Sequence, residues 1–424
     1  MWIKGLSLFL IMGAMIAFTG CVRQSAEVVR PEKIYSKRLV IYDDSTYIKL
    51  ADLWKKYYHA FPSEDAYANW IYAARYANDP DYSELLEKGL KKYPSNPTIL
   101  YLKGILLCGR EDNALDIANL ERSAQIDPTY LDPYYGLVTN YMNSGEQEKM
   151  DWALKEIFYQ GGIPDEIVDY NYNMLAGLEE NAILVTNGDM DTYPGWVLQN
   201  VLNFRRDVAI INRSLLNTRW YPLYVMNRGA PTFITPSELD KLRENMEAQL
   251  KKTDFKPSDA GIVGDTLTAR VILAGERENR PVYLAATLYI TPPLKPYAEQ
   301  GALLGLAVMV TKPGKAAAEY YRKTAETWLN TYRTSGMDRW GFHNANEFTN
   351  SGRRLMMNYG AAMADLLEKL HPLDPQYTPK LFQWYIDHLL TLIPQNYGEQ
   401  FGRNWTKYQS VDIIRAWCQQ QGYF

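Results

Sequence analysis

The central part of this 424-residue chain is organised around the stretch Asn181–Pro194, which reads NAILVTNGDMDTYP. Its short apolar run is rich in branched residues, which is typical of a buried β-strand, and the following Asn-Gly is typical of a turn. Pro194 can begin a helix, and a second apolar run occupies Asp207–Asn212. This spacing predicts one strand–helix–strand crossover, so the two strands should be parallel neighbours.

The same alternation of strands and helices continues to about residue 311. A charged amphipathic helix is expected over Ser237–Lys252, capped by Thr235 or by Ser237. Apolar runs predict a third strand at Pro281–Leu288 and a fourth at Leu303–Val310. Alternating strands and helices favour an α/β layer with mainly parallel strands.

The region before this layer repeats itself. Pro94 and Pro128 lie 34 positions apart, and a small residue, Gly89 or Ser123, precedes each of them by five positions. This is the period of tetratricopeptide repeats, and both segments resemble the closing turn of that repeat. About three helix pairs are therefore expected between Tyr47 and Ile163. The alternative is an ordinary helical bundle in which the spacing has no meaning.

Helical periodicity returns at the C-terminal end, over Ala316–Tyr332, Asn350–Leu370 and Pro379–Ile393. The predicted fold class is therefore α/β plus all-α, with helical repeats, a mainly parallel α/β layer and a helical C-terminal region. The expected domains are a signal peptide at 1–20, a tether at 21–46, repeats at 47–165, an α/β domain at 166–314 and helices at 315–424.

The N-terminal residues differ from the rest of the chain. Lys4 precedes an apolar stretch, Leu6–Ala17, and the segment Phe18–Cys21 ends in cysteine. This pattern resembles the lipobox of a bacterial lipoprotein, in which Cys21 becomes lipidated and anchors the protein in a membrane. A plain signal peptide or a short anchor with a coincidental cysteine is the alternative.

The residues after Cys21 also predict the cellular location of the protein. No acidic cluster follows Cys21. In Bacteroidota lipoproteins an acidic stretch at that place tends to mark surface export, so the expected location is the outer membrane, facing the periplasm.

Composition limits the possible partners. The formal net charge is −4 and the pI is about 5.8, so the chain lacks the basic footprint of a nucleic-acid-binding protein. Cys108 and Cys418 lie in apolar helical contexts and are expected to be buried free thiols. The histidines are scattered singly, which gives a zinc site little support: His59, His343, His371 and His388. No metal and no cofactor is predicted.

Polar side chains follow the first two predicted strands. Asp189 and Asp191 follow the first, and the candidates after the second are Asn212, Arg213, Asn217 and Arg219. Because the carboxyl ends of parallel strands share one edge of the sheet, these six residues are predicted to face one another at a ligand-binding rim. The alternative is structural, since Asp191 or Thr192 can cap the following helix and Arg–Asp pairs can join loops.

No catalytic residue is predicted. The sequence Asp189-Met190-Asp191 fits the first half of the haloacid dehalogenase nucleophile motif, but Thr192 comes one position early and no convincing downstream lysine and paired aspartates follow. Neither a phosphate-binding glycine loop nor a serine nucleophile motif is present.

One further resemblance concerns Asn181 to Tyr359. Its most specific parts are Asn181–Gln199, Asp207-Val208 and Ser214–Tyr221. These segments resemble the soluble region of a Bacteroidota family of protein O-mannosyltransferase-like multi-pass membrane proteins, in which that region is often joined to tetratricopeptide repeats. The sequence departs from the family at three positions: Met190, Gly195 and Arg219.

The membrane-embedded transferase part of that family has no counterpart in this sequence, so the resemblance implies a shared soluble module and not the transferase activity. The expected function is a membrane-anchored envelope lipoprotein that recruits a protein partner through its repeats and its α/β module. The alternative is a cation-dependent hydrolase or glycan-processing enzyme that uses Asp189 and Asp191.

Overall fold

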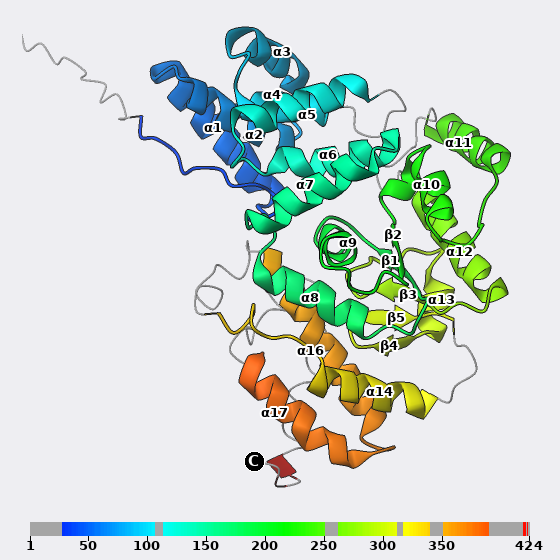
Figure 1. The fold of residues 1–424 in the computed structure, drawn as a ribbon. Helices are drawn as coiled ribbons and strands as arrows, with labels where there is room; N and C mark the ends of the chain where they lie inside the picture. Colours follow the sequence, from blue (N-terminus) through cyan, green and yellow to red (C-terminus); the bar gives the residue numbers. More distant parts are fainter. Residues whose placement is uncertain are drawn as a thin grey trace, which may run out of the picture.

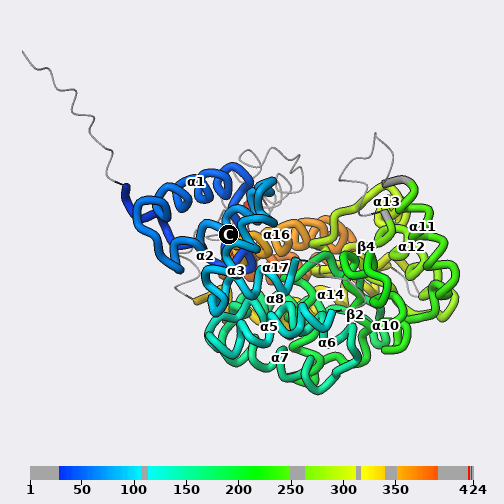
Figure 2. Tube along the Cα trace, turned by 90° about the horizontal axis from the view of Figure 1, so that it is seen from above, coloured from blue at the N-terminus to red at the C-terminus, as the bar shows by residue number. Residues whose placement is uncertain are grey.

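The computed structural model describes residues 28–106, 113–250, 262–311, 317–339, 351–389, 419–420 and 422. The N-terminal helices, a sheet with its covering helices and the C-terminal helices follow one another across the molecule (Figure 1). Viewed from above, α1–α3 and α10–α12 lie at opposite ends (Figure 2). Within the described ranges, no helix has the length and apolar content needed to cross a bilayer.

Seven helices form the N-terminal array, and a short loop joins most of them. Ser63 caps the second helix, because its side chain accepts a hydrogen bond from the amide of Ala66. The helices are α1 (Asp44–Ala60), α2 (Glu64–Tyr76), α3 (Tyr82–Lys92), α4 (Pro97–Gly104), α5 (Ala114–Ile126), α6 (Asp132–Ser144) and α7 (Gln147–Tyr159).

About three helix pairs were expected between Tyr47 and Ile163, and the pairs that pack most extensively are α1 with α2, α4 with α5, and α6 with α7, whereas α3 contacts both α2 and α4. Pro94 and Pro128 follow the ends of α3 and α5, where a proline stops a helix from continuing. Gly104 allows α4 and α5 to approach closely, since a Cβ atom at this position would lie 2.6 Å from Cγ of Leu120. Gly136 on α6 contacts the same leucine, so Leu120 fills the space between two successive pairs.

The sheet has five strands in the order β2-β1-β3-β5-β4. The first three strands are parallel, as predicted, and Ile183 of β1 pairs with Ala209 of β2 and Val282 of β3. Most of their residues are buried, which accounts for their continuous apolar sequence. The strands are β1 (Ile183–Thr186), β2 (Ala209–Asn212), β3 (Val282–Ala285), β4 (Ala302–Leu304) and β5 (Ala307–Met309).

The fourth predicted strand, Leu303–Val310, is wrong in detail. It is a hairpin of two short antiparallel strands, with Leu303 opposite Val308, and β5 also pairs antiparallel with β3. Gly305 turns the chain with a φ of +66°, a conformation that glycine adopts without steric cost. Gly305 was the sequence signal for this turn within the predicted apolar run. Because β5 pairs antiparallel with β3 and β4, the sheet is mixed.

Helices on both sides cover the sheet, and the C-terminal helices pack beside β4. Thr235 caps α11 as predicted, because it exchanges hydrogen bonds with Glu238 in a capping box. These elements are α8 (Asp165–Ala176), α9 (Tyr193–Asn200), a 3₁₀ turn η1 (Leu215–Asn217), α10 (Tyr221–Asn227), α11 (Pro236–Leu250), α12 (Ile262–Arg277), α13 (Lys295–Gln300), α14 (Ala317–Asn330), α16 (Ser351–Leu370), η3 (Pro375–Tyr377) and α17 (Thr378–His388).

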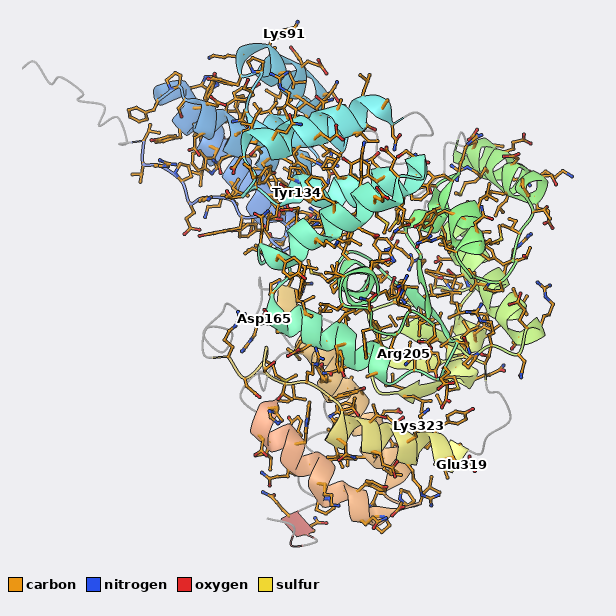
Figure 3. All side chains as sticks on the ribbon, in the orientation of Figure 1. Lys91, Tyr134, Asp165, Arg205, Glu319 and Lys323 are labelled. Carbon is orange, nitrogen blue, oxygen red and sulfur yellow. The ribbon has the colours of Figure 1, made fainter. Side chains whose placement is uncertain are left out.

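The end of α8 is held by a residue from the crossover between β1 and β2. Arg205 has a left-handed φ of +49°, and its guanidinium donates hydrogen bonds to the carbonyls of Leu175, Leu178 and Glu179. Lys323 of α14 forms an ion pair with the side chain of Glu179 at 2.9 Å. Arg205 and Lys323 both lie near this end of α8 (Figure 3), so it joins the sheet to the C-terminal helices.

Candidate functional site

The loop after β1 carries the two predicted carboxylates, and the structure gives them different environments. Asp191 is buried. Its carboxylate accepts hydrogen bonds from the amide of Asn187 at 2.7 Å and of Gly188 at 2.8 Å, and from the hydroxyl of Thr287. Burial raises the pKa of Asp191 above its ordinary value of 3.8, and these hydrogen bonds offset part of the rise. Asp191 therefore joins its own loop to the chain that follows β3.

Neither Asp191 nor Thr192 caps α9, although the sequence allowed both. Thr192 stands at the N-cap position, but its side chain makes no cap hydrogen bond. Its hydroxyl instead pairs with that of Thr186 at 2.6 Å and accepts from Nδ2 of Asn212 at 2.9 Å. The tertiary contacts across the end of the sheet therefore replace the local cap.

Asn212 lies where the parallel pairing predicted. Its Nδ2 contacts the loop after β1, including the carbonyl of Gly188 at 3.4 Å, and its Oδ1 accepts from the amide of Leu215. The structure thus brings Asn212 and the loop that contains Asp189 and Asp191 to the same edge of the sheet. Both polar atoms of the Asn212 side chain therefore bond to groups of the protein itself.

The other three candidates face the helices that follow β2, and not the two aspartates. Nε of Arg213 lies 2.9 Å from Oδ1 of Asp265 on α12, and both side chains are largely buried. Oδ1 of Asn217 accepts a hydrogen bond from the amide of Gly264 at 2.9 Å. Arg219 lies 3.5 Å from Glu247 at the surface. Arg213 and Arg219 therefore pair with carboxylates of later helices, and the Arg–Asp pairs that the sequence allowed at this rim are not formed with Asp189 or Asp191.

Asp189 has a partner that sequence reasoning missed. Its Oδ2 lies 3.1 Å from Nε of Arg38, which belongs to the segment before α1. Arg38 also contacts Asp132 of α6 at 3.3 Å and Tyr101 of α4 at 3.3 Å, and its guanidinium stacks over Tyr135 at 4.2 Å. One cation thereby joins the segment before α1, the N-terminal helices and the sheet.

The guanidinium of Arg38 stays charged in this buried place. Burial by itself would lower the pKa of Arg38, but Tyr101, Asp189 and Asp132 raise it above its ordinary value. No sequence pattern points to this role, since Arg38 lies in a polar segment without periodicity. Thr287 was easier to find, because it follows the third parallel strand at the same edge of the sheet.

The segment that contains Arg38 runs along α2 and α6 of the N-terminal helices. Its main chain is held by side chains, since the amide of Ile34 donates to Oδ1 of Asn69 at 3.3 Å and the amide of Lys37 donates to the hydroxyl of Tyr72 at 3.0 Å. Ser36 donates to Asp132 at 2.6 Å. The segment therefore lies along α2 and α6 as an extended ligand would.

A cavity of about 480 Å³ adjoins this segment. Residues of α2, α4 and α6 line it together with the segment itself. Four carboxylates and a single lysine contribute to the lining: Glu64, Asp65, Asp127, Asp132 and Lys33. The face formed by α2, α4 and α6 thus has free space beside the segment that it already holds.

Within the described ranges, no group of three or more histidine, cysteine or acidic side chains is placed to bind a metal ion. Cys21, Cys108, Cys418 and His343 lie outside those ranges. The arrangement around Asp189 and Asp191 provides internal hydrogen bonds and one ion pair.

Comparison with protein families gives one match. Residues 167–232 match the model of TMEM260-associated domain 2. The match includes the loop of Asp189 and Asp191, and it agrees in general terms with the resemblance to O-mannosyltransferase-like proteins. Comparison with curated proteins found no match. The chain therefore contains a segment similar to TMEM260-associated domain 2, built from α8, β1, α9, β2 and α10.

Proposed function

We propose that the protein is a Bacteroidota envelope lipoprotein that acts as a protein-binding scaffold through its helical repeats and its α/β module. One observation carries the proposal: the inner face of the repeats holds an extended segment through side chains that reach its main chain, as Asn69 and Tyr72 do. Main-chain recognition of this kind suits an extended polypeptide of varied sequence. A partner segment would bind in the adjoining cavity or take the place of the tether.

The charge of the cavity limits which polypeptide segments could bind in it. Of its four carboxylates, Asp65 and Asp132 are paired with Arg30 and Arg38, which leaves Glu64 and Asp127 beside one lysine, so a partner segment with lysine or arginine residues has the matching chemistry. Asp132 already binds the guanidinium of Arg38 on this face. An arginine in a partner segment would find the same kind of acceptor.

The lipid anchor completes the proposal. Six residues separate Cys21 from Val28, where the described chain begins. A fully extended chain of that length spans at most about 25 Å, so lipidation of Cys21 would hold the repeats close to the membrane. The outer membrane, on its periplasmic side, is the location we propose.

Photo-crosslinking in cells tests the scaffold function. A photoreactive amino acid replaces Thr98, which lines the cavity, and a control replaces Leu115, which is 77% exposed on α5. We expect one or a few discrete adducts of higher mass from position 98 and none of these from position 115. The absence of adducts at position 98, or the same adducts at both positions, would contradict the proposal. A crosslink to the protein's own tether leaves the mass unchanged and is thereby distinguished.

A further inference from the structure

A second cavity, of about 350 Å³, lies against the free edge of the sheet. β2 is the edge strand, and it lies between α9 and α10 near α6 and α7 (Figure 1). None of the six predicted ligand residues lines this cavity, and the scaffold function makes no use of it. Its volume is within the range of small-molecule pockets, which is roughly 300–1,000 Å³.

Polar atoms make up most of the surface of this cavity, and a smaller apolar part comes from the side chains of a few elements. Met142 and Met150 come from α6 and α7, Trp196 from α9 and Val225 from α10, and the main chain around Ile210 contributes the strand side. Methionine side chains are flexible and polarisable, so they adapt to ligands of irregular shape. These apolar side chains suit an apolar group of a ligand, such as a ring or a short hydrocarbon chain.

The edge strand supplies main-chain groups to the same cavity. The amide of Ala209 donates to the carbonyl of Ala182, and the amide of Arg213 donates to the carbonyl of Thr186. In a parallel ladder, alternate residues of a strand bond to the same neighbour. The peptide groups of Ile210 therefore point away from β1, towards the cavity that this residue lines.

The edge is too short to accept an added strand. The two neighbouring outward groups are already bonded, because the amide of Asn212 donates to the hydroxyl oxygen of Tyr221 at 2.9 Å and the carbonyl of Val208 accepts from Nε2 of Gln199 at 2.7 Å. Ile210 alone remains between them. An extended polypeptide needs a row of such groups, so the geometry favours a compact ligand.

Two arginines give the cavity its charge. Arg206 and Arg228 line it and are exposed, and among the described residues neither forms an ion pair. Arg228 lies over the ring of Tyr224 at 6.0 Å, and Nη1 of Arg206 donates to Oδ1 of Asn203 at 3.3 Å. Other arginines of the α/β domain do pair with carboxylates: Arg205, Arg213, Arg219, Arg270 and Arg280.

An adjoining hollow of about 690 Å³ is lined by the same two arginines. Three carboxylates also line that hollow: Asp207 and Glu278 are engaged by Arg205 and Arg280, and Glu180 forms no ion pair within the described ranges. Arg206 and Arg228 thus border both spaces, and their charges are free to meet an anion.

We propose that the cavity beside β2 binds a small organic anion. Its apolar body lies against Met142, Met150 and Trp196, its carboxylate or phosphate group meets Arg206 and Arg228, and a polar atom near the apolar body bonds to the peptide group of Ile210. The site lies within the segment similar to TMEM260-associated domain 2 for most of its lining.

Fluorescence titration of the full chain with two probes tests the site. Anilinonaphthalene sulfonate carries an anionic group, whereas phenylnaphthylamine has nearly the same rings without it. We expect the sulfonate to bind the wild-type protein more tightly than the neutral probe. Arg206→Gln/Arg228→Gln should weaken sulfonate binding by about tenfold or more and change binding of the neutral probe less than about twofold.

A matched variant controls for net charge. Arg270→Gln/Arg322→Gln removes two positive charges that are paired and partly exposed elsewhere, and it should bind both probes as the wild type does. Asn200→Trp places a ring at the cavity and should weaken the binding of both probes. If the Asn200→Trp protein does not fold, Asn227→Trp fills the same cavity in its place. The thermal unfolding midpoint verifies the fold of each variant.

Three results would overturn the proposal: equal affinity of the wild type for both probes, unchanged sulfonate binding in Arg206→Gln/Arg228→Gln, or unchanged binding in the cavity-filling variant. Competition with octanoate and octyl phosphate then identifies the anion. Displacement of the sulfonate by either one supports a carboxylate or a phosphate ligand, and displacement by neither contradicts the site.

Discussion

Nε of Arg38 lies 3.1 Å from Oδ2 of Asp189, although these residues belong to the tether and to the loop after β1. The same guanidinium reaches Asp132 on the repeats. Asp189, predicted as a ligand residue, is therefore part of the contact that joins the repeats to the sheet.

Arg38→Ala should lower the free energy of unfolding by about 2–4 kcal/mol, because it leaves the carboxylate of Asp132 buried without its cation. It should also release the tether, so trypsin should cleave after Lys33 and Lys37 sooner. Arg30→Ala is the control, since its ion pair with Asp65 is well exposed and should contribute less than about 1 kcal/mol. Equal effects of the two substitutions in denaturant unfolding would refute a special role for Arg38.

Asp191→Asn should destabilise the protein by about 1–3 kcal/mol at pH 4, because an amide group cannot accept from both Asn187 and Gly188 as the carboxyl group does. Burial raises the pKa of Asp191 in the folded state, so the folded protein binds this proton more tightly than the unfolded chain. Its contribution is therefore fully present below pH 3.8 and falls as the pH rises through the folded-state value.

The advantage of the wild type over Asp191→Asn should thus shrink between pH 4 and pH 7. Urea unfolding of both proteins at the two pH values measures it, and all other groups cancel in the difference. An advantage that grows with pH would show that the hydrogen bonds from Asn187, Gly188 and Thr287 outweigh burial.

Gly104→Ala should lower the stability of the repeats by about 1–3 kcal/mol, since the new methyl group would lie 2.6 Å from Leu120. Gly188→Ala is the control, because nothing lies within 4 Å of a Cβ atom there and its φ is not in the left-handed region. In the double variant with Leu120→Ala, the cost of Gly104→Ala should be smaller. Additive costs in thermal unfolding would mean that the two residues do not share this space.

Arg205→Ala should cost about 2–3 kcal/mol, because it removes charged hydrogen bonds to the carbonyls of Leu175, Leu178 and Glu179. Lys323→Ala removes a partly exposed ion pair at the same end of α8 and should cost less than about 1 kcal/mol. Denaturant unfolding compares the two variants. The reverse order would place the main connection in the C-terminal helices.

Cys21→Ser tests the proposed anchor. Cells grown with an alkyne-labelled fatty acid should incorporate the label into the wild-type protein and not into the variant, and the variant should leave the membrane fraction. A labelled variant, or an unlabelled wild-type protein, would favour the plain signal peptide or the short anchor instead.

The sequence by itself determined the local elements. The apolar run Ile183–Thr186 and the turn after it predicted a buried strand, and the 34-residue spacing of Pro94 and Pro128 predicted helix pairs. The strand and the helices are present because they depend on neighbours in the chain, whereas the assignment of the helices to tetratricopeptide-like repeats stays a prediction. The hairpin at Gly305 was missed because two strands of three residues are too short to differ from one apolar run.

Only the tertiary structure decided which charges meet. Asp189 pairs with Arg38, Arg213 pairs with Asp265, and Asp191 takes its hydrogen bonds from two amides and Thr287. Sequence patterns placed Asp189, Asp191 and Asn212 at one edge of the sheet, because parallel strands end together. They could not identify the partners, since the energy of a charge depends on whichever group the whole fold brings within a few ångströms of it.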